Sequence, residues 1–154
     1  MYCNSVSQKP AANTGRLLAF IFRLIAQYIA ITLLYACFRN FASMNNWIHI
    51  KSEEDFHNIV AASEQKPQII FKDSTTCGIS AHAKERLKDG YSLIAEKADF
   101  HYLDLLTFRP VSNLIAQALT VTHQSPQIIV LKDKQVVYTS SHHAINTASI
   151  AGHL

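Results

Sequence analysis

The hydrophobic residues of this chain follow two different patterns, which divide it near residue 43. Between 17 and 38 the sequence is almost continuously apolar, and Arg23 is the only charged residue there. About 20 apolar residues in a helix can cross the hydrocarbon core of a bilayer, so this segment predicts a hydrophobic helix. From residue 44 onward, short apolar runs alternate with amphipathic stretches that are typical of helices. The second part therefore predicts alternating strands and helices.

Local signals at the ends of these stretches define the predicted elements. Ser52 is a helix N-cap followed by acidic residues, Gly90 ends a helical pattern, Pro110 suits a first helical turn, and the pair 133–134 joins two strands as a hairpin. The predicted strands are 47–50, 68–72, 100–106, 127–132 and 135–139, and the predicted helices are 53–62, 77–88, one from Pro110 carrying Leu114, Ile115, Ala118 and Leu119 on one side, and a weak one after 144. The order β-α-β-α-β-α-β-β-α predicts an α/β fold of three layers, thioredoxin-like, preceded by an N-terminal hydrophobic helix.

Residues 1–43 are open to three interpretations. The segment 17–38 could be a transmembrane anchor, for which Lys9 and Arg16 favour a cytoplasmic N-terminus. It could be a lipoprotein signal that ends at Cys37. It could also be an upstream extension that the mature protein lacks, with translation beginning at Met44. In each case we expect a thioredoxin-like domain over 44–154.

Composition narrows the classes of function. The 154 residues are 49% hydrophobic and 16% charged, which suits one globular domain and argues against disorder. Residues 1–43 carry four basic and no acidic residues, whereas residues 44–154 carry ten basic and eleven acidic ones. The second part thus lacks the basic surplus that nucleic-acid binding needs. None of the eight histidines has a recognised ligand spacing, so we expect no metal site.

Cys77 is the position at which the sequence best supports chemistry. It lies where a polar turn meets the predicted helix 77–88, and the unpaired N–H groups of a helix N-terminus stabilise a thiolate nucleophile. The alternative is a small buried hydrophobic residue. Ser80 shares the helix face and could donate a hydrogen bond to the thiolate, but it cannot form a disulfide. A mixed disulfide at Cys77 would therefore need an outside thiol to resolve it.

Ser125 and Pro126 open the fourth predicted strand. In a thioredoxin-like fold this proline would be cis and face the cysteine, leaving the Ser125 backbone free to pair with a substrate strand. The alternative is a trans proline that merely starts the strand. The same loop would bring His123 towards Cys77, in a structural or substrate-contacting role.

The charged residues of the helix after Cys77 predict a solvated helix face. They are Lys84, Glu85, Arg86, Lys88 and Asp89.

Four short blocks give the chain a family resemblance, at 71–81, 109–113, 123–127 and 141–146. Together they resemble the YtxJ family, the monothiol bacilliredoxins of the bacillithiol system, over 44–154. The resemblance implies a thioredoxin fold and a thiol–disulfide oxidoreductase that removes bacillithiol from protein mixed disulfides.

The resemblance also implies the roles of particular residues and partners. Cys77 takes the position of the family's active cysteine, assisted by Ser80, and the substrate-binding residues are Thr76, Gly78, Ser125 and Pro126. It further implies a cytoplasmic location, bacillithiolated proteins and a low-molecular-weight thiol as partners, and bacillithiol as a cosubstrate without a bound cofactor. The family usually has proline at position 78 and often a basic residue at position 76, so both departures bear on the rate.

Two other functions stay open at this point. The motif Cys-Gly-Ile-Ser at 77–80 is similar to the Cys-Gly-Phe-Ser motif of monothiol glutaredoxins, which carry an iron–sulfur cluster. The Thr-Val-Pro and Gly-Gly-Asp segments of those proteins are missing from this sequence. The third possibility is a binding module that has kept the fold and lost the activity.

Overall fold

The structure, a computed structural model, describes Gln27 and residues 47–154. The chain divides into two units, Met1–Phe41 and Ala42–Leu154, and the domain described below belongs to the second. Gln27 lies in a helix; the rest of the predicted hydrophobic segment 17–38, and the boundary predicted at residue 43, lie outside the described residues. Among the described residues, no helix has the length and apolar character needed to span a membrane.

The elements of the domain follow the predicted order. They are β1 (Ile48–His49), α2 (Glu53–Ala62), β2 (Gln68–Asp73), α3 (Gly78–Asp89), the 3₁₀ turn η2 (Tyr91–Leu93), β3 (Asp99–Asp104), α4 (Arg109–Ala118), β4 (Gln127–Lys132), β5 (Gln135–Ser141), the 3₁₀ turn η3 (His142–Ala144) and α5 (Thr147–Ala151).

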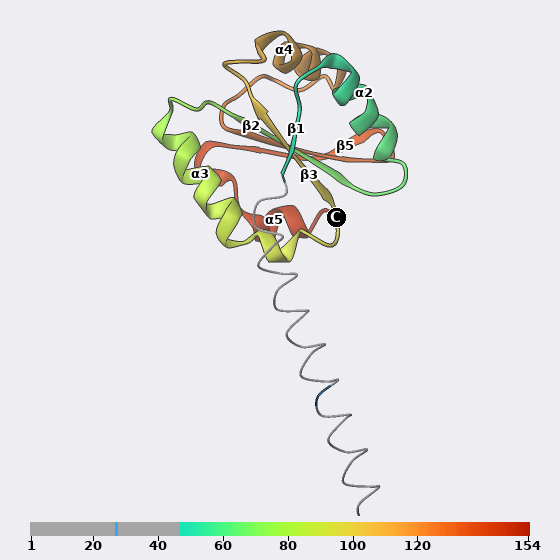
Figure 1. Ribbon diagram of the computed structural model, residues 1–154, viewed down its shortest axis with the longest axis vertical. Coiled ribbons are helices and arrows are strands. Elements are labelled where there is room, and N and C mark those ends of the chain that lie inside the picture. Colours follow the sequence, from blue (N-terminus) through green and yellow to red (C-terminus); the bar gives the residue numbers. More distant parts are fainter. Residues whose placement is uncertain (1–26, 28–46) are drawn as a thin grey trace, which may run out of the picture. The chain divides into compact units, whose positions relative to one another are not determined.

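One five-stranded sheet, in the order β1-β3-β2-β4-β5, forms the middle layer. β1, β3 and β2 are parallel, whereas β4 runs antiparallel to β2 and pairs with β5 as a hairpin. Helices α2 and α4 cover one face of the sheet, and α3 and α5 cover the other (Figure 1). Each face has its own apolar core. The predicted three-layer α/β fold is therefore confirmed.

Two turns in this domain are fixed by side-chain contacts. Ser52 and Asp55 form a reciprocal capping box at the start of α2, because each side chain accepts from the other residue's backbone N–H. At the predicted hairpin turn, Asp133 and Lys134 adopt left-handed φ angles of 51° and 61°. Ser63, at the end of α2, accepts the N–H of Asp133 with its carbonyl and the N–H of Lys134 with its hydroxyl, both at 2.9 Å. This contact ties the hairpin turn to α2.

Two details of the predicted helices and strands were wrong. On α4 the predicted apolar side is confirmed for Ile115, which is buried, and for Leu114 and Leu119, which pack against the same core. Ala118 is exposed instead, and Val111 and Ser112 are buried, because α4 packs mainly through its first turns. The third strand ends at Asp104, and its four central residues are all buried, because helices cover both faces of the sheet.

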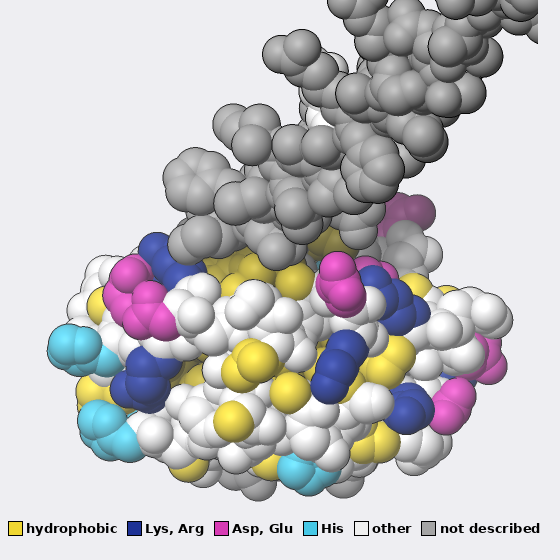
Figure 2. All heavy atoms as spheres, turned by 90° about the horizontal axis from the view of Figure 1, so that it is seen from below, with side chains coloured by type: hydrophobic (Ala, Val, Ile, Leu, Met, Phe, Trp, Pro, Cys, Tyr) yellow, Lys and Arg dark blue, Asp and Glu magenta, His cyan; other side chains and the backbone are white. Residues whose placement is uncertain are grey.

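The charges on the surface are mixed. On the face drawn in Figure 2, Lys and Arg side chains are interspersed with Asp and Glu side chains. The near balance of basic and acidic residues in 44–154 leads to such a surface.

Candidate active site

Cys77 lies at the carboxyl edge of the sheet, as the N-cap of α3. Its backbone is extended (φ −102°, ψ 123°), and its carbonyl accepts the first helical hydrogen bond, from the N–H of Ala81, at 3.1 Å. Its own N–H closes a turn by donating to the carbonyl of Ser74 at 2.9 Å. The side chain is half-buried, between the exposed residues Thr76 and Gly78. The N–H groups of the first helical turn therefore lie next to an accessible sulfur.

Ser80 anchors the loop that leads to Cys77. Its side chain is fully buried, and its hydroxyl oxygen accepts the N–H of Ser74 at 3.2 Å. Ser74 is thus held twice, by Ser80 at its N–H and by Cys77 at its carbonyl. Donation from the Ser80 hydroxyl to a thiolate would use the hydrogen of that group, and it stays a prediction.

The peptide bond between Ser125 and Pro126 is cis, as expected for a thioredoxin-like fold. The side chain of Gln127 fixes the preceding loop, because it donates to the carbonyl of Thr122 at 2.9 Å and accepts the N–H of Gln124 at 3.4 Å. In the described part of the chain, neither the backbone nor the buried hydroxyl of Ser125 has a hydrogen-bond partner. This backbone is therefore available to another chain.

The register of the sheet brings this loop and the cysteine to the same edge. Lys72, near the end of β2, pairs with Gln127 at the start of β4. Pro126 immediately precedes β4, and the chain reaches Cys77 five residues after Lys72.

Arg86 links helix α3 to the cis-proline loop. It donates to the carbonyls of His142 and Ile145, both at 3.2 Å, and the N–H of His142 donates to the carbonyl of Pro126 at 3.0 Å. His142 reaches this position with a left-handed φ of 55°. The prediction that Arg86 belongs to a solvated helix face was therefore wrong, because its guanidinium group satisfies two backbone carbonyls.

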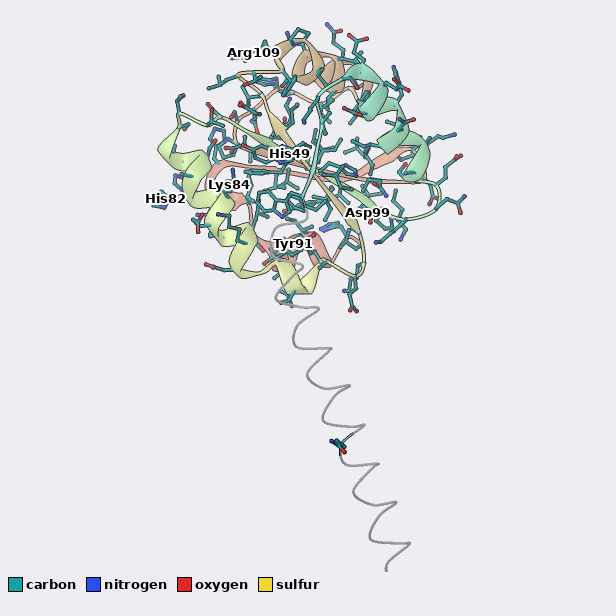
Figure 3. The ribbon with its side chains drawn as sticks, in the orientation of Figure 1. His49, His82, Lys84, Tyr91, Asp99 and Arg109 are labelled. Carbon is teal, nitrogen blue, oxygen red and sulfur yellow. The ribbon has the colours of Figure 1, made fainter. Side chains whose placement is uncertain are left out.

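The same prediction was wrong for Lys84, which faces the sheet. Its Nζ lies 3.4 Å from Oδ2 of Asp73, 3.3 Å from the hydroxyl of Tyr102 and 4.3 Å from the centre of the Tyr102 ring. Figure 3 shows Lys84 on the sheet side of α3 and His82 on its outer side. Lys84 follows Ser80 by four residues and precedes Leu87 by three, so this buried stripe could have revealed its orientation.

Asp73 is a buried carboxylate at the end of β2. Its side chain accepts the Tyr102 hydroxyl hydrogen at 2.8 Å, and Asp73 is only 3% exposed. Burial, together with this hydrogen bond to Asp73, raises the pKa of Tyr102 well above its usual value. Tyr102 therefore stays a neutral donor throughout the ordinary pH range.

Lys72 is a second buried ion near the site, at a strand end whose polar residues look ordinary in the sequence. It is 0% exposed, and its Nζ lies 3.2 Å from the carbonyl of Ser112 and 2.9 Å from Nδ1 of His123. Burial, and next the positive charge of Arg109, lower the pKa of Lys72 to about 8. Burial also lowers the pKa of His123, helped by the charges of Lys72 and Arg109. His123 thus contacts Lys72, and its predicted approach to Cys77 stays a prediction.

Comparison with known proteins identifies the family. The sequence profile of the family described as "Monothiol bacilliredoxin BrxC" matches residues 48–150, which is most of the chain. The chain belongs to the monothiol bacilliredoxin family. The resemblance inferred from the four sequence blocks is therefore confirmed.

Solved structures similar to this bacilliredoxin carry the same fold. A protein described as a proposed oxidoreductase with a thioredoxin fold is 30% identical, with 69% of this chain and 91% of that chain covered and a TM-score of 0.59. Mitochondrial thioredoxin 3 from Saccharomyces cerevisiae (20% identity, 72% and 96% covered, TM-score 0.55) and thioredoxin from Trypanosoma brucei brucei (14%, 70% and 87%, 0.56) share the fold alone. Family and fold together define the chain as a thiol oxidoreductase.

Metal-ligating residues do not gather in the described domain of this bacilliredoxin. Among residues 47–154, no group of three or more His, Cys, Asp or Glu side chains is arranged to hold a metal ion.

Proposed function

We propose that the protein removes bacillithiol from protein mixed disulfides, with Cys77 as the single nucleophile. The observation that carries this proposal is the position of Cys77: it is the only cysteine within the matched residues 48–150, and it caps the N-terminus of α3 directly after the central strand. Thiol–disulfide exchange needs an accessible sulfur that is stabilised as a thiolate. Cys77 is half-buried and stands at the N-cap of α3, the position at which the backbone N–H groups of a first helical turn favour an anion.

The reaction is one sulfur-for-sulfur exchange. The Cys77 thiolate attacks the bacillithiol sulfur of a protein–S–S–bacillithiol bond, so a Cys77–bacillithiol disulfide forms and the protein sulfur leaves as a thiolate. The protein is thereby reduced, and Cys77 carries the oxidation. Because Ser80 offers no second thiol, an external thiol must attack the bacillithiol sulfur of the new disulfide, so that Cys77 leaves as a thiolate and bacillithiol departs in a mixed disulfide with that thiol.

The substrate protein would bind as an extended segment across the cis-proline loop. Ser125 supports this, because its backbone N–H and carbonyl have no partner among the described residues. An extended peptide can satisfy both groups, as in strand addition to a sheet edge. Thr76 and Gly78 flank the sulfur and are exposed, so they would contact the segment on its other side.

Bacillithiol is a cytoplasmic thiol, so the domain would act in the cytoplasm, free or anchored through 17–38. It would need bacillithiol as a cosubstrate and no bound metal or organic cofactor.

The test is intact mass spectrometry of the full chain after mixing with a bacillithiolated test protein. In the double variant Cys3→Ser/Cys37→Ser, Cys77 is the only cysteine, and we expect one bacillithiol adduct together with release of the reduced test protein. The control adds Cys77→Ser to the same background and should show neither product. A Cys77 that alkylates freely but never gains the adduct would overturn the bacillithiol assignment. Visible absorbance in protein purified without oxygen would favour an iron–sulfur carrier instead.

A further inference from the structure

We infer that His123 and Arg109, with the buried Lys72 behind them, form a subsite that binds a carboxylate of the small-molecule half of the mixed disulfide. Nothing in the proposed exchange chemistry uses these residues. The inference rests on the proposed function and specifies what the site recognises next to the reacting sulfur atoms.

Lys72 is buried and protonated at neutral pH. Its side chain is 0% exposed, and its Nζ donates to the carbonyl of Ser112 at 3.2 Å. With a pKa of about 8, lowered chiefly by burial, it is mostly an ammonium ion at neutral pH. An ammonium group has three donors and no acceptor. Its 2.9 Å contact with Nδ1 of His123 must therefore be a hydrogen bond that Lys72 donates.

The contact with Lys72 fixes the tautomer of the His123 ring. Since Nδ1 accepts from Lys72, the ring hydrogen of the neutral imidazole lies on Nε2. The ring stays neutral because burial and the charges of Lys72 and Arg109 lower its pKa. His123 is exposed, so it offers a fixed N–H donor at the protein surface. The buried ammonium polarises this donor and strengthens its hydrogen bond to an anion.

The positive charges of Lys72 and Arg109 have no carboxylate partner among the described residues. Burial of a charge is costly unless it is paired, and an ion pair normally provides the opposite charge. Among the described residues, neither Lys72 nor Arg109 takes part in an ion pair; the paired lysines there are Lys66, Lys84, Lys88 and Lys134. The cluster thus has positive charge and donors and no carboxylate of its own.

The cluster lies at the edge of the sheet that also carries Cys77. Parallel strands β2 and β3 end at the same edge of the sheet, and Arg109 opens α4 after β3. Asp99, the first residue of β3, and Arg109, which follows β3, lie at opposite ends of the sheet in Figure 3. His123 lies three residues before the cis-proline Pro126, which immediately precedes β4, and β4 begins beside Lys72. A mixed disulfide bound at Cys77 would thus place its small-molecule half at the edge of the sheet that carries this cluster.

Carboxylate is the anion that this position favours. Bacillithiol and glutathione both carry carboxylates, and a carboxylate accepts hydrogen bonds from an imidazole N–H and a guanidinium group. The cluster would therefore distinguish charged from neutral small-molecule thiols. The experiment below compares the two charged thiols, bacillithiol and glutathione, with each other.

The experiment measures the rate at which the full chain releases different small molecules from one test protein. The same cysteine is capped in turn with bacillithiol, glutathione or neutral 2-mercaptoethanol. We expect His123→Leu to slow release of both charged caps about tenfold, the effect of losing one hydrogen bond to a charged group. Release of 2-mercaptoethanol should change less than about twofold, because this cap has no anion that could accept the hydrogen bond of His123. His123→Gln should restore most of the rate, because its amide carries an N–H donor at the place of Nε2.

Two controls separate recognition from folding. Arg109→Gln should weaken only the charged caps and should reduce the salt dependence of their release, whereas Arg109→Lys should retain both. Equal slowing of charged and neutral caps by His123→Leu would overturn the subsite and leave the exchange function intact. A preference for bacillithiol over glutathione that disappears in these variants would identify bacillithiol as the bound carboxylate source.

A measurement without catalysis keeps the inference testable if exchange itself fails. Nitrogen-15 NMR of the His123 ring should show the Nε2–H tautomer in the wild type and its loss in Lys72→Met. Added malate, a dicarboxylate probe, should shift the His123 signals in the wild type and much less in Arg109→Gln. Unchanged His123 signals at saturating malate would contradict the subsite whatever the exchange assay shows.

Discussion

The hydroxyl group of Tyr102 donates a 2.8 Å hydrogen bond to Oδ2 of Asp73. The two residues lie on neighbouring parallel strands, at the carboxyl edge of the sheet from which the cysteine loop departs. Lys84 approaches the same oxygen only to 3.4 Å, so the buried carboxylate depends mainly on the tyrosine.

Tyr102→Phe should therefore destabilise the domain by about 1–3 kcal/mol, the cost of leaving a buried acceptor without its best donor. Urea unfolding at neutral pH measures the free energy of unfolding. The matched control is Tyr138→Phe, at a side chain that stacks on His153 and is only partly buried. It should change stability by less than about 0.5 kcal/mol. Equal effects of the two substitutions would contradict this role of the Tyr102 hydroxyl.

His101 should make stability depend on pH between 7 and 5. It is 6% exposed, its Nε2 contacts Oε1 of Gln68 at 2.7 Å, and burial lowers its pKa from 6.5 to about 4. The folded state thus favours the neutral ring, so this stability is present above pH 6.5 and is lost as the pH falls towards 4. We expect a loss of about 2 kcal/mol between pH 7 and pH 5 from this residue.

The control for this pH dependence is another histidine. In His101→Gln, urea unfolding at the two pH values should differ much less than in the wild type, whereas in His82→Gln, at an exposed position, the full difference should persist. A wild-type slope that His101→Gln leaves unchanged would assign the proton uptake to other groups.

Two glycines should respond to substitution in opposite directions. A Cβ atom at Gly78 would meet no atom within 4 Å, and the extended backbone of Cys77 suits a residue that precedes proline. Gly78→Pro, at the first helical position, should stabilise the domain by about 0.4–1 kcal/mol. A Cβ at Gly90 would overlap the side chain of Thr147, whose Cβ lies 2.7 Å away. Gly90→Ala should cost about 1–3 kcal/mol.

Thermal and urea unfolding of both glycine variants measures these changes. Alkylation of Cys77 in Gly78→Pro then reports what the N–H of residue 78 contributes to reactivity, because proline removes that donor. Destabilisation by Gly78→Pro would mean that the helix start needs the glycine backbone.

Ser80→Ala should loosen the cysteine loop. It removes the acceptor of the Ser74 N–H, a partly buried hydrogen bond worth about 1 kcal/mol. We expect faster hydrogen exchange at the Ser74 amide and a comparable loss of unfolding free energy. Ser112→Ala is the control, since the Ser112 hydroxyl is buried and has no partner in the described domain. A changed pH profile of Cys77 alkylation with no change at Ser74 would instead support the predicted hydrogen bond to the thiolate.

The sequence was sufficient for the fold because its local signals agree with one another. The capping box at Ser52, the proline at the start of α4 and the short hairpin turn each fix an element boundary. Local signals do not show which polar residues the tertiary packing buries. β2 is buried at all six positions, so its Lys72 and Asp73 lie inside the domain although each looks like an ordinary polar strand end.

Sequence reasoning could propose the parts of the candidate site that short motifs carry, and it missed contacts between residues distant in the sequence. Cys77 with Ser80, and Ser125 with Pro126, are short motifs, and the cis bond was expected from the fold. The contact of Lys72 with His123 spans 51 positions, and nothing local in the sequence marks it.

The central place of β2 has a consequence for synthesis of the chain. β2 leaves the ribosome before both of its neighbours, β3 and β4, and the second of them begins only at Gln127. Until then the apolar strand has an open edge that can pair with other chains. We expect a nascent chain that stops before Gln127 to depend on chaperones, and the native domain to form only once the final hairpin has emerged.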